Sequence, residues 1–208
     1  MSYESVQDRF SRMAGKFGPQ VAVMRGAQQI TYAELEAESN RLANFLLESG
    51  ATKGTMVALF TDDPIRIITG ILGVLKAGAV FVPLDPTFPL GRLFVMSDKV
   101  EPLWFVSEQK HLEKLDQLRG LSGGNGQVLC LDDTSYHGNT DAPGIASDPD
   151  APCSIYFTSG STGKPKAILG RLKGIDHFMR WEIDAVNAGF GSAGERCMAI
   201  SALLAVEP

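Results

Sequence analysis

The chain has 208 residues, of which 44% are hydrophobic and 21% are charged. These shares are close to globular averages, so the chain can bury a core and is not disordered along its whole length. The net charge is −5, and this mildly acidic balance argues against binding to a nucleic acid, which needs a basic face. No apolar run is long enough to cross a bilayer, so a membrane is not an expected partner either.

The N-terminus and the cysteines predict a cytoplasmic location. Residues 1–15 lack the apolar core of a signal peptide. Cys130, Cys153 and Cys197 are odd in number, lie far apart and have no histidine nearby. They therefore fit neither a disulfide framework nor a zinc site, and they suit a reducing compartment.

Helix and strand patterns alternate from Thr31 onward. Thr31 and Glu34 form a capping box, in which the two side chains satisfy backbone N–H groups at a helix start. The helix that they begin is expected to end at Gly50. Asp63 followed by Pro64 predicts another helix start, because proline at the first helical position forfeits no hydrogen bond. The further predicted helices span residues 65–76, 89–100 and 108–118, and the predicted strands span 55–60, 79–82, 103–106 and 127–131.

This alternation predicts the fold class. Strands and helices that alternate along a chain favour an α/β fold with a mostly parallel sheet flanked by helices. The predicted strands are short and mostly apolar, as strands buried on both faces are. Residues 132–152 differ, since they are rich in Pro, Asp, Ser and Gly and have no apolar period.

We therefore divide the chain into three parts. Residues 1–132 are predicted to form an α/β subdomain, and residues 133–152 a surface connection. Residues 153–208 are predicted to hold two strands around a polar loop, a helix and the start of a next strand. The two strands cover 154–157 and 166–170.

The loop between these strands, TSGSTGKPK over residues 158–166, is the most informative segment. It offers four hydroxyl groups and two lysines. Its two glycines permit positive φ and close approach, which turns successive N–H groups toward an anion. The candidate phosphate-binding residues are Thr158, Ser159, Gly160, Ser161, Thr162, Gly163, Lys164 and Lys166.

The loop is not a Walker motif. Only two residues separate Gly160 from Gly163, whereas the Walker pattern has four and continues into a helix. Pro165 pushes Lys164 out of helical geometry, so the loop joins two strands and uses no helix dipole. The alternative interpretation is a flexible surface turn. The apolar strands on both sides and the two lysines favour polyphosphate binding over that alternative.

At family level, TSGSTGKPK resembles the phosphate-loop signature of the adenylate-forming (AMP-binding) enzymes, which include acyl-CoA synthetases, luciferases and the adenylation domains of nonribosomal peptide synthetases. Two further segments, residues 30–54 and 75–93, are similar to the peptide-synthetase branch. The resemblance covers roughly residues 5–200.

The resemblance implies the N-terminal portion of an amino-acid-activating adenylation domain. Such a domain converts a carboxylate and ATP into an acyl-adenylate and pyrophosphate. It implies ATP and Mg²⁺ as cofactors, with the loop at the β- and γ-phosphates; no magnesium ligand and no catalytic residue is assigned in this chain. The implied partners are an amino acid or other carboxylate, and a complementing C-terminal chain or a carrier protein.

The sequence departs from the family pattern at three places. Ala167 stands where the family usually has Gly, and Leu172 stands where it often has His. Residues 197–208 do not reproduce the family's segment for the substrate amino group, and neither Val206 nor Glu207 is assigned that role. Because the adenine, ribose and catalytic-lysine segments are also unmatched, we expect a truncated chain that is inactive alone. The alternatives are a non-catalytic pseudo-enzyme with a structural or partner-binding role and, less favoured, an independent nucleotide-binding module.

Other polar and aromatic residues have structural explanations. Asp85 is expected to accept a hydrogen bond in a turn, and Trp104 to lie in the core. The charged residues of 108–118 are expected to form a solvated helix face. His111 and His137 are expected to be exposed.

Overall fold

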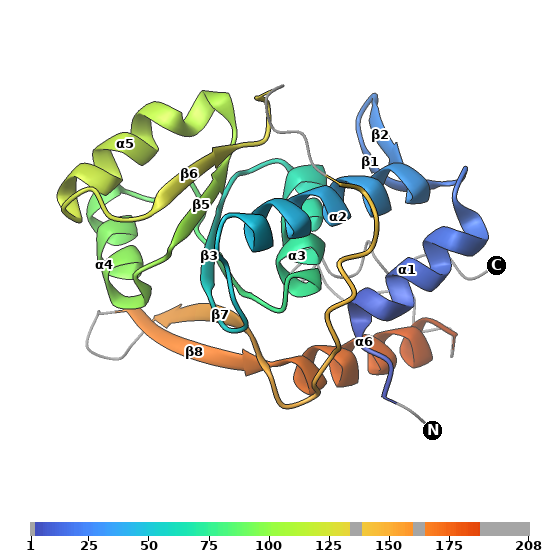
Figure 1. The fold of residues 1–208 in the computed structure, drawn as a ribbon. Coiled ribbons are helices and arrows are strands. Elements are labelled where there is room, and N and C mark those ends of the chain that lie inside the picture. Colours follow the sequence, from blue (N-terminus) through green and yellow to red (C-terminus); the bar gives the residue numbers. More distant parts are fainter. Residues whose placement is uncertain (1–2, 134–138, 160–164, 188–208) are drawn as a thin grey trace.

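The computed structural model of the chain describes residues 3–133, 139–159 and 165–187. A six-stranded sheet with the order β6-β5-β3-β4-β7-β8 forms its centre, and β1 and β2 form a separate two-stranded ribbon (Figure 1). The helices are α1 (Val6–Phe17), α2 (Tyr32–Glu48), α3 (Pro64–Lys76), α4 (Leu90–Val100), α5 (Leu112–Leu121) and α6 (Leu172–Asn187). The strands are β1 (Val21–Arg25), β2 (Gln28–Thr31), β3 (Met56–Phe60), β4 (Val80–Pro83), β5 (Trp104–Ser107), β6 (Gln127–Cys130), β7 (Pro152–Ser159) and β8 (Pro165–Arg171).

The central sheet confirms the predicted fold class. Strands β6, β5, β3, β4 and β7 pair in parallel, and only β8 pairs antiparallel, with β7. Helices α2 and α3 lie on one face of this sheet, and α4 and α5 lie on the other (Figure 1). The parallel order follows from the helical connections, which return the chain to the same end of the sheet after each strand.

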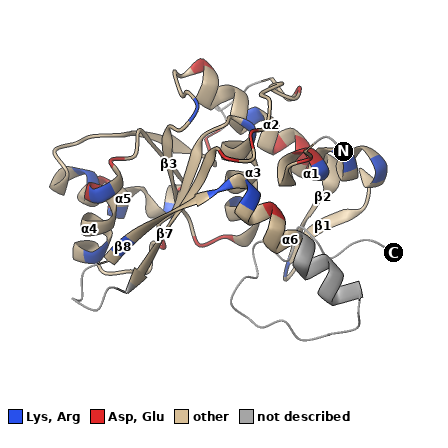
Figure 2. Cartoon of the chain, turned by 90° about the horizontal axis from the view of Figure 1, so that it is seen from below, with Lys and Arg blue, Asp and Glu red and all other residues tan. Residues whose placement is uncertain are grey.

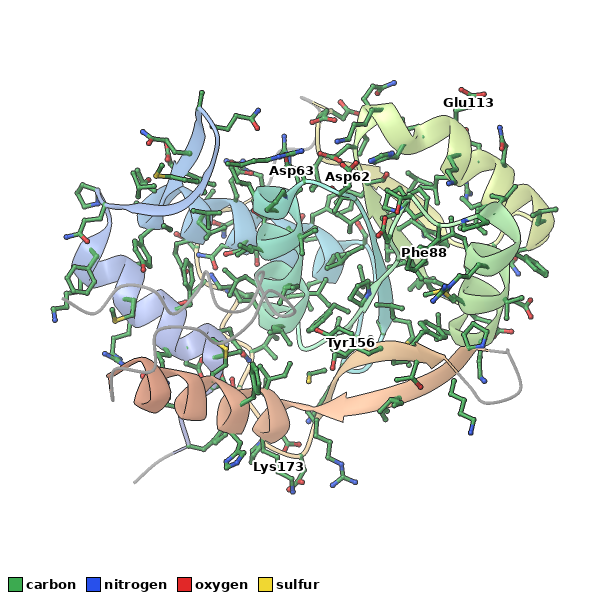
Figure 3. All side chains as sticks on the ribbon, turned by 180° about the vertical axis from the view of Figure 1, so that it is seen from behind. Asp62, Asp63, Phe88, Glu113, Tyr156 and Lys173 are labelled. Atoms are coloured by element: carbon green, nitrogen blue, oxygen red, sulfur yellow. The ribbon has the colours of Figure 1, made fainter. Side chains whose placement is uncertain are left out.

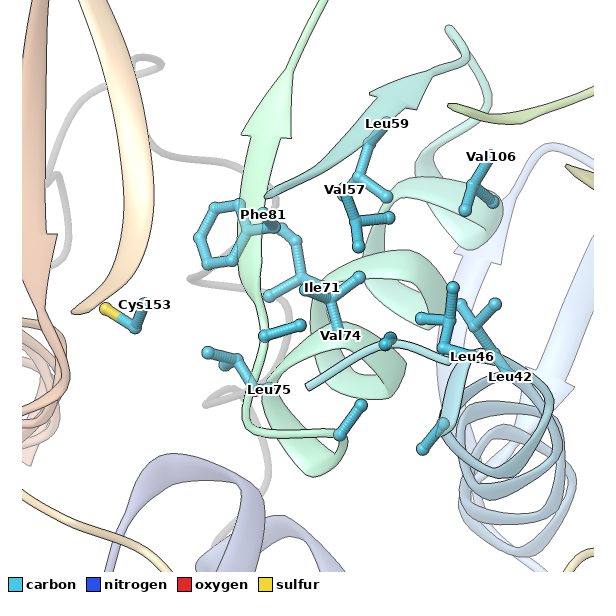
Figure 4. Close-up of a cluster of buried hydrophobic side chains, with 14 of the residues drawn as sticks. Leu42, Leu46, Val57, Leu59, Ile71, Val74, Leu75, Phe81, Val106 and Cys153 are labelled. Carbon is cyan, nitrogen blue, oxygen red and sulfur yellow. The ribbon is translucent and has the colours of Figure 1, made fainter. Parts of the chain in front are cut away.

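Alternation along β3 assigns its side chains to the two helical layers. Val57 and Leu59 pack with α2 and α3, whereas Ala58 and Phe60 pack with α4 and α5. All four are nearly or completely buried, which explains why none of these positions carries a polar residue. Figure 4 shows the layer under α3, where Leu42, Leu46, Val57, Ile71, Val74 and Phe81 meet.

The helix starts predicted at Thr31 and at Asp63–Pro64 are confirmed, whereas the helix predicted from residue 108 begins at Leu112. The Thr31 side chain accepts from the Glu34 N–H, and the Glu34 carboxylate accepts from the Thr31 N–H at 2.8 Å. Asp63 accepts from the N–H groups of Ile65 and Arg66 at the start of α3. The local hydrogen bonds therefore set both helix boundaries, as the sequence predicted.

The structure adds three elements up to Thr31 that were not predicted from the sequence, namely α1, β1 and β2. Helix α1 begins with its own capping box, between Ser5 and Asp8. Strands β1 and β2 pair antiparallel around Gly26, whose φ is +59°. A positive φ is readily adopted only by glycine, which explains this residue in the tight turn.

Residues 139–151 run across the helices without forming a helix or strand. Asn44 donates to the carbonyl oxygens of Asn139 and Asp141, and the Ser147 hydroxyl lies 2.9 Å from that of Ser5. These contacts attach the segment to α2 and to the start of α1. The three-part division of the chain stays a prediction.

The described residues include no membrane-spanning helix. None of their helices combines the length and the apolar character that crossing a bilayer requires.

Candidate functional site

The candidate phosphate loop lies at the tip of the β7–β8 hairpin. Thr158 at the end of β7 is the register partner of Lys166 in β8, and Ser159 is the partner of Pro165. The hairpin is anchored on the β7 side, where Ser154 and Ile155 are 1% and 6% exposed. The strand pair predicted around the loop is thereby confirmed, and its two ends are held close together.

The end of β7 that leads into the loop extends past the carboxyl end of β4 in the parallel sheet. Phe81 of β4 is the register partner of Ser154 in β7. Since β4 ends at Pro83 and β7 continues to Ser159, Thr158 lies beyond the end of β4. In open α/β sheets, ligands bind at the carboxyl ends of the strands, and the loop is placed at that edge.

The structure locates three of the eight predicted site residues. The side chains of Thr158 and Lys166 are exposed beside the tip, and Ser159 is the last residue of β7. The other five lie outside the described residues, and they are Gly160, Ser161, Thr162, Gly163 and Lys164. Whether this group binds phosphate stays a prediction.

A further cation near the tip comes from α4. The Lys99 ammonium lies 3.4 Å from the carbonyl oxygen of Pro165, and it donates to that oxygen. Figure 2 shows lysine and arginine positions on α4 and at the junction of β8 and α6. Lys99 was not predicted from the sequence, because it lies 66 residues from Pro165 in the chain and belongs to no local motif.

A second polar cluster occupies the same carboxyl edge, at the ends of β3 and β5. The Lys110 ammonium lies 2.5 Å from an Asp62 carboxylate oxygen and 3.4 Å from a Glu108 oxygen. The His111 Nε2 atom lies 3.2 Å from Asp62 and 3.6 Å from Glu108. Thr61 donates to Glu108 at 2.8 Å. Figure 3 labels Asp62 at this edge, next to the start of α3.

This cluster corrects two predictions. The side chain of His111 is 15% exposed and packs edge-on against the Phe60 ring, so it is not an exposed bystander. Glu108 is only 7% exposed and precedes α5, so it is not part of a solvated helix face. The charge pattern of 108–118 did not reveal this, because Glu108 directly follows the buried strand β5 and precedes the helix. His137 lies outside the described residues.

Ion pairing favours the charged forms of Asp62 and Lys110. The hydrogen bond from Lys110 is the main reason that the pKa of Asp62 is lowered, and His111 adds to the effect. The same bond with Asp62 raises the pKa of Lys110. Asp62 and Lys110 are therefore an ion pair at neutral pH.

The cluster is a poor fit to the expected Mg²⁺. Asp62, Glu108 and His111 have ligand atoms within 4.8 Å of one another. Mg²⁺ prefers oxygen ligands in octahedral geometry, however, and here an imidazole supplies one of the three atoms. Lys110 already pairs with both carboxylates. We therefore assign no magnesium ligand among the described residues.

The family of the chain follows from the comparison with known proteins. Residues 10–202 match the model of the AMP-binding enzyme family. The chain belongs to the AMP-binding enzyme family.

Curated relatives of this AMP-binding chain are peptide synthetases. It is 37% identical to surfactin synthase subunit 3 of Bacillus subtilis (strain 168) over 164 residues, which is 75% of the chain and 12% of the relative. It is 34% identical to tyrocidine synthase 2 of Brevibacillus parabrevis over 189 residues, which is 89% of the chain and 5% of the relative. The chain thus spans a small part of these relatives.

Solved structures show the same fold at low sequence identity. The nonribosomal peptide synthetase FmoA3 (S1046A) superposes with a TM-score of 0.80 and 22% identity, over 96% of this AMP-binding chain and 21% of that one. The N-terminal domain of FACL13 from Mycobacterium tuberculosis superposes with a TM-score of 0.76 and 21% identity, over 84% and 46% of the two chains. These likenesses confirm that the chain has the fold of the N-terminal subdomain of adenylation domains.

Proposed function

We propose that this chain is the N-terminal part of an amino-acid-activating adenylation domain, and that its β7–β8 loop holds the phosphates of ATP. The reaction of the complete domain would join a carboxylate to the α-phosphorus of ATP and release pyrophosphate. One observation carries the proposal. A segment rich in hydroxyls, glycines and lysines joins β7 to β8 at the carboxyl edge of the sheet, where Thr158 and Lys166 are register partners. A solved form of FmoA3 has AMPPNP bound, which supports the same nucleotide class here.

The described residues would act on the phosphates by charge and position. Lys166 and Lys99 both lie beside the hairpin tip, and cations there would offset the negative charge that builds on the leaving pyrophosphate. The Thr158 hydroxyl would donate to a phosphate oxygen from the opposite strand. Paired strands hold these groups at a fixed spacing, which favours in-line attack by limiting the positions that the phosphates can adopt. Mg²⁺, when bound, would supply further charge neutralisation.

Nucleotide binding tests the role of the loop. A variant with both Lys164→Ala and Thr162→Ala should bind ATP more weakly than the unchanged chain, by about a hundredfold or more, because it loses two charge-assisted hydrogen bonds that contribute about 1.5–3 kcal/mol each. Isothermal titration calorimetry would measure both affinities. Lys53→Ala is the matched control, since Lys53 is an exposed lysine that precedes β3 at the opposite edge of the sheet. Equal affinities for all three proteins would remove the loop from the proposal.

Catalysis by the chain alone is not expected. The chain spans only a small part of the peptide synthetases that it matches. We therefore expect no amino-acid-dependent exchange of pyrophosphate into ATP by the purified 208-residue chain. Robust exchange would contradict this part of the proposal.

A second candidate function is a non-catalytic, partner-binding role. The observation that favours it is the wide exposure of Ile168 and Leu169 on β8, at 52% and 56%. ATP binding that is insensitive to the loop variant, together with normal folding, would favour this candidate over the first.

A further inference from the structure

Three side chains with metal-binding atoms meet where β3 and β5 end. Asp62 follows β3 (Figure 3), whereas Glu108 and His111 lie between β5 and α5. Each offers one ligand atom, and the three atoms lie within 4.8 Å of one another. The His111 Nε2 atom is 3.2 Å from an Asp62 oxygen and 3.6 Å from a Glu108 oxygen. Residues that are distant in sequence are thus gathered around one point.

The spacing of these atoms suits a tetrahedral metal ion. Zn²⁺ binds imidazole nitrogen and carboxylate oxygen at about 2.0–2.2 Å, so two ligand atoms at the corners of a tetrahedron lie about 3.3–3.6 Å apart. The two distances from the His111 Nε2 atom, 3.2 and 3.6 Å, are close to this range. Three protein ligands would leave the fourth position to a water molecule.

A hydrogen bond does not account for the position of the His111 ring. The Nε2 atom is buried, and it completes no hydrogen bond among the described residues although Asp62 is 3.2 Å away. A buried nitrogen without a partner is unfavourable, because it has lost its hydrogen bonds to water. A metal ion bound at the Nε2 lone pair would supply the missing partner and would also neutralise the carboxylates.

Neighbouring groups from β3 and its end hold two of the ligands in place. The Thr61 hydroxyl donates to the Glu108 carboxylate at 2.8 Å, and Glu108 is only 7% exposed. The Phe60 ring packs edge-on against the His111 imidazole. Groups of this kind orient the ligands of metal sites, so little rearrangement is needed when the ion binds.

Lys110 shows that the cluster already attracts a cation. Its ammonium lies 2.5 Å from Asp62 and 3.4 Å from Glu108, on the same two oxygens that face His111. The Lys110 side chain is 49% exposed and has a flexible stem, so the ammonium can turn toward water when another cation arrives. Lys110 would therefore weaken metal binding by competition without preventing it.

We propose that Asp62, Glu108 and His111 form a binding site for Zn²⁺ or a similar divalent transition metal, which displaces the Lys110 ammonium. Zn²⁺ accepts imidazole and carboxylate ligands together, whereas Mg²⁺ prefers oxygen ligands alone. The bound ion would join the end of β3 to the segment before α5 and stabilise this edge of the sheet. The site includes no residue of the phosphate loop, so this proposal does not depend on the proposed function.

Titration with zinc chloride tests the proposal. The whole chain would be freed of metal by dialysis against a chelator, and isothermal titration calorimetry without nucleotide should then show one ion whose binding depends on His111. His111→Gln should weaken this binding by about tenfold or more, because loss of a group that merely orients a ligand usually costs that much. Lys110→Met should strengthen binding, because it removes the competing ammonium. His177→Gln is the matched control, since His177 is exposed on α6 and its loss should leave the affinity unchanged.

Cobalt identifies the ligand atoms without any variant. Co²⁺ held by nitrogen and oxygen should give weak visible absorption bands and no charge-transfer band from a thiolate. Cys130→Ser should not alter binding, although Cys130 is a partly exposed thiol at the end of β6, beside β5. The proposal is overturned if the unchanged chain binds no Zn²⁺, if His111→Gln binds it equally well, or if a thiolate band appears. A Lys110→Met variant that is folded by circular dichroism but gains no affinity would also contradict it.

Discussion

At the scale of single residues, Lys76 is a buried cation that joins three helices. Its ammonium lies 2.7 Å from the Glu36 carboxylate and donates to Ser39 and Asn40. It also lies 5.7 Å from the centre of the Phe10 ring. Lys76 is only 6% exposed, and burial lowers its pKa despite the opposing effect of Glu36. The role of this lysine is therefore structural, and the Glu36 carboxylate stabilises its positive charge.

Removal of this cation should be costly. Lys76→Ala leaves the largely buried Glu36 carboxylate without its counter-ion, so the free energy of unfolding should fall by about 3–5 kcal/mol. Lys53→Ala is the control, because Lys53 and its partner Asp148 are both exposed and an exposed ion pair contributes little to stability. Urea denaturation of both variants would measure the difference. Similar losses in the two variants would contradict the structural role.

The cysteines should differ in reactivity. Burial raises the pKa of Cys153 to about 11, and its side chain is buried, whereas Cys130 is partly exposed. At pH 8 only about a thousandth of Cys153 is then thiolate, which is the reactive form. Peptide mass spectrometry after iodoacetamide treatment at pH 8 should find Cys130 alkylated well before Cys153. Faster labelling of Cys153 would show that β7 opens readily to solvent.

At the scale of elements, the close packing of α2 on α3 depends on one glycine. A Cβ atom at Gly73 would lie 2.7–2.8 Å from three atoms of Leu42, one of which is the Leu42 Cβ. A Cβ atom is fixed to the backbone, so it cannot turn away as the end of a side chain can. The two helices would have to separate to accommodate any larger residue at position 73.

Gly73→Ala should therefore destabilise the protein in spite of the higher helix propensity of alanine. We expect the free energy of unfolding to fall by about 1–3 kcal/mol, the usual effect of overpacking. The matched control is Gly15→Ala in α1, where nothing lies within 4 Å of the added atom. That change should raise stability by up to about 1 kcal/mol. Thermal denaturation would compare the two, and a gain in both variants would contradict the packing described here.

At the scale of the whole molecule, the first and last described segments are in contact. The Tyr3 hydroxyl donates to the Asp176 carboxylate, which joins residues 173 positions apart in sequence. Asp176 is 5% exposed, and burial is the main reason that the pKa of Tyr3 is raised, with the Asp176 carboxylate adding to the effect. Through this bond the start of the chain helps to hold α6, and α6 follows directly on β8 of the candidate site.

Loss of this bond should loosen α6. Tyr3→Phe removes a donor from a buried carboxylate, so the free energy of unfolding should fall by about 1–3 kcal/mol. Amides of residues 172–179 should also exchange faster with deuterated solvent, while those of α2 stay protected. Unchanged exchange in α6 would show that other contacts suffice to hold it.

Local sequence signals predicted much of the fold. The capping box at Thr31, the Asp63–Pro64 helix start and the apolar strands each depend on residues within a few positions, where backbone hydrogen bonding and burial act directly. The same signals missed α1 and the β1–β2 ribbon, although Ser5 and Asp8 form a box of the same kind. Apolar composition also did not distinguish the exposed edge strand β8 from the buried strands beside it, since burial depends on which neighbours cover a strand.

The sequence by itself determined the family, the α/β class and a polar loop between two strands, because these depend on short motifs and on periodicity. Only the tertiary structure brought Lys99 beside Pro165, gathered Asp62, Glu108 and His111 at one edge, and left β8 open. Those placements depend on the order of the strands in the sheet. Strand order is set by packing over the whole chain, so no local pattern of residues specifies it.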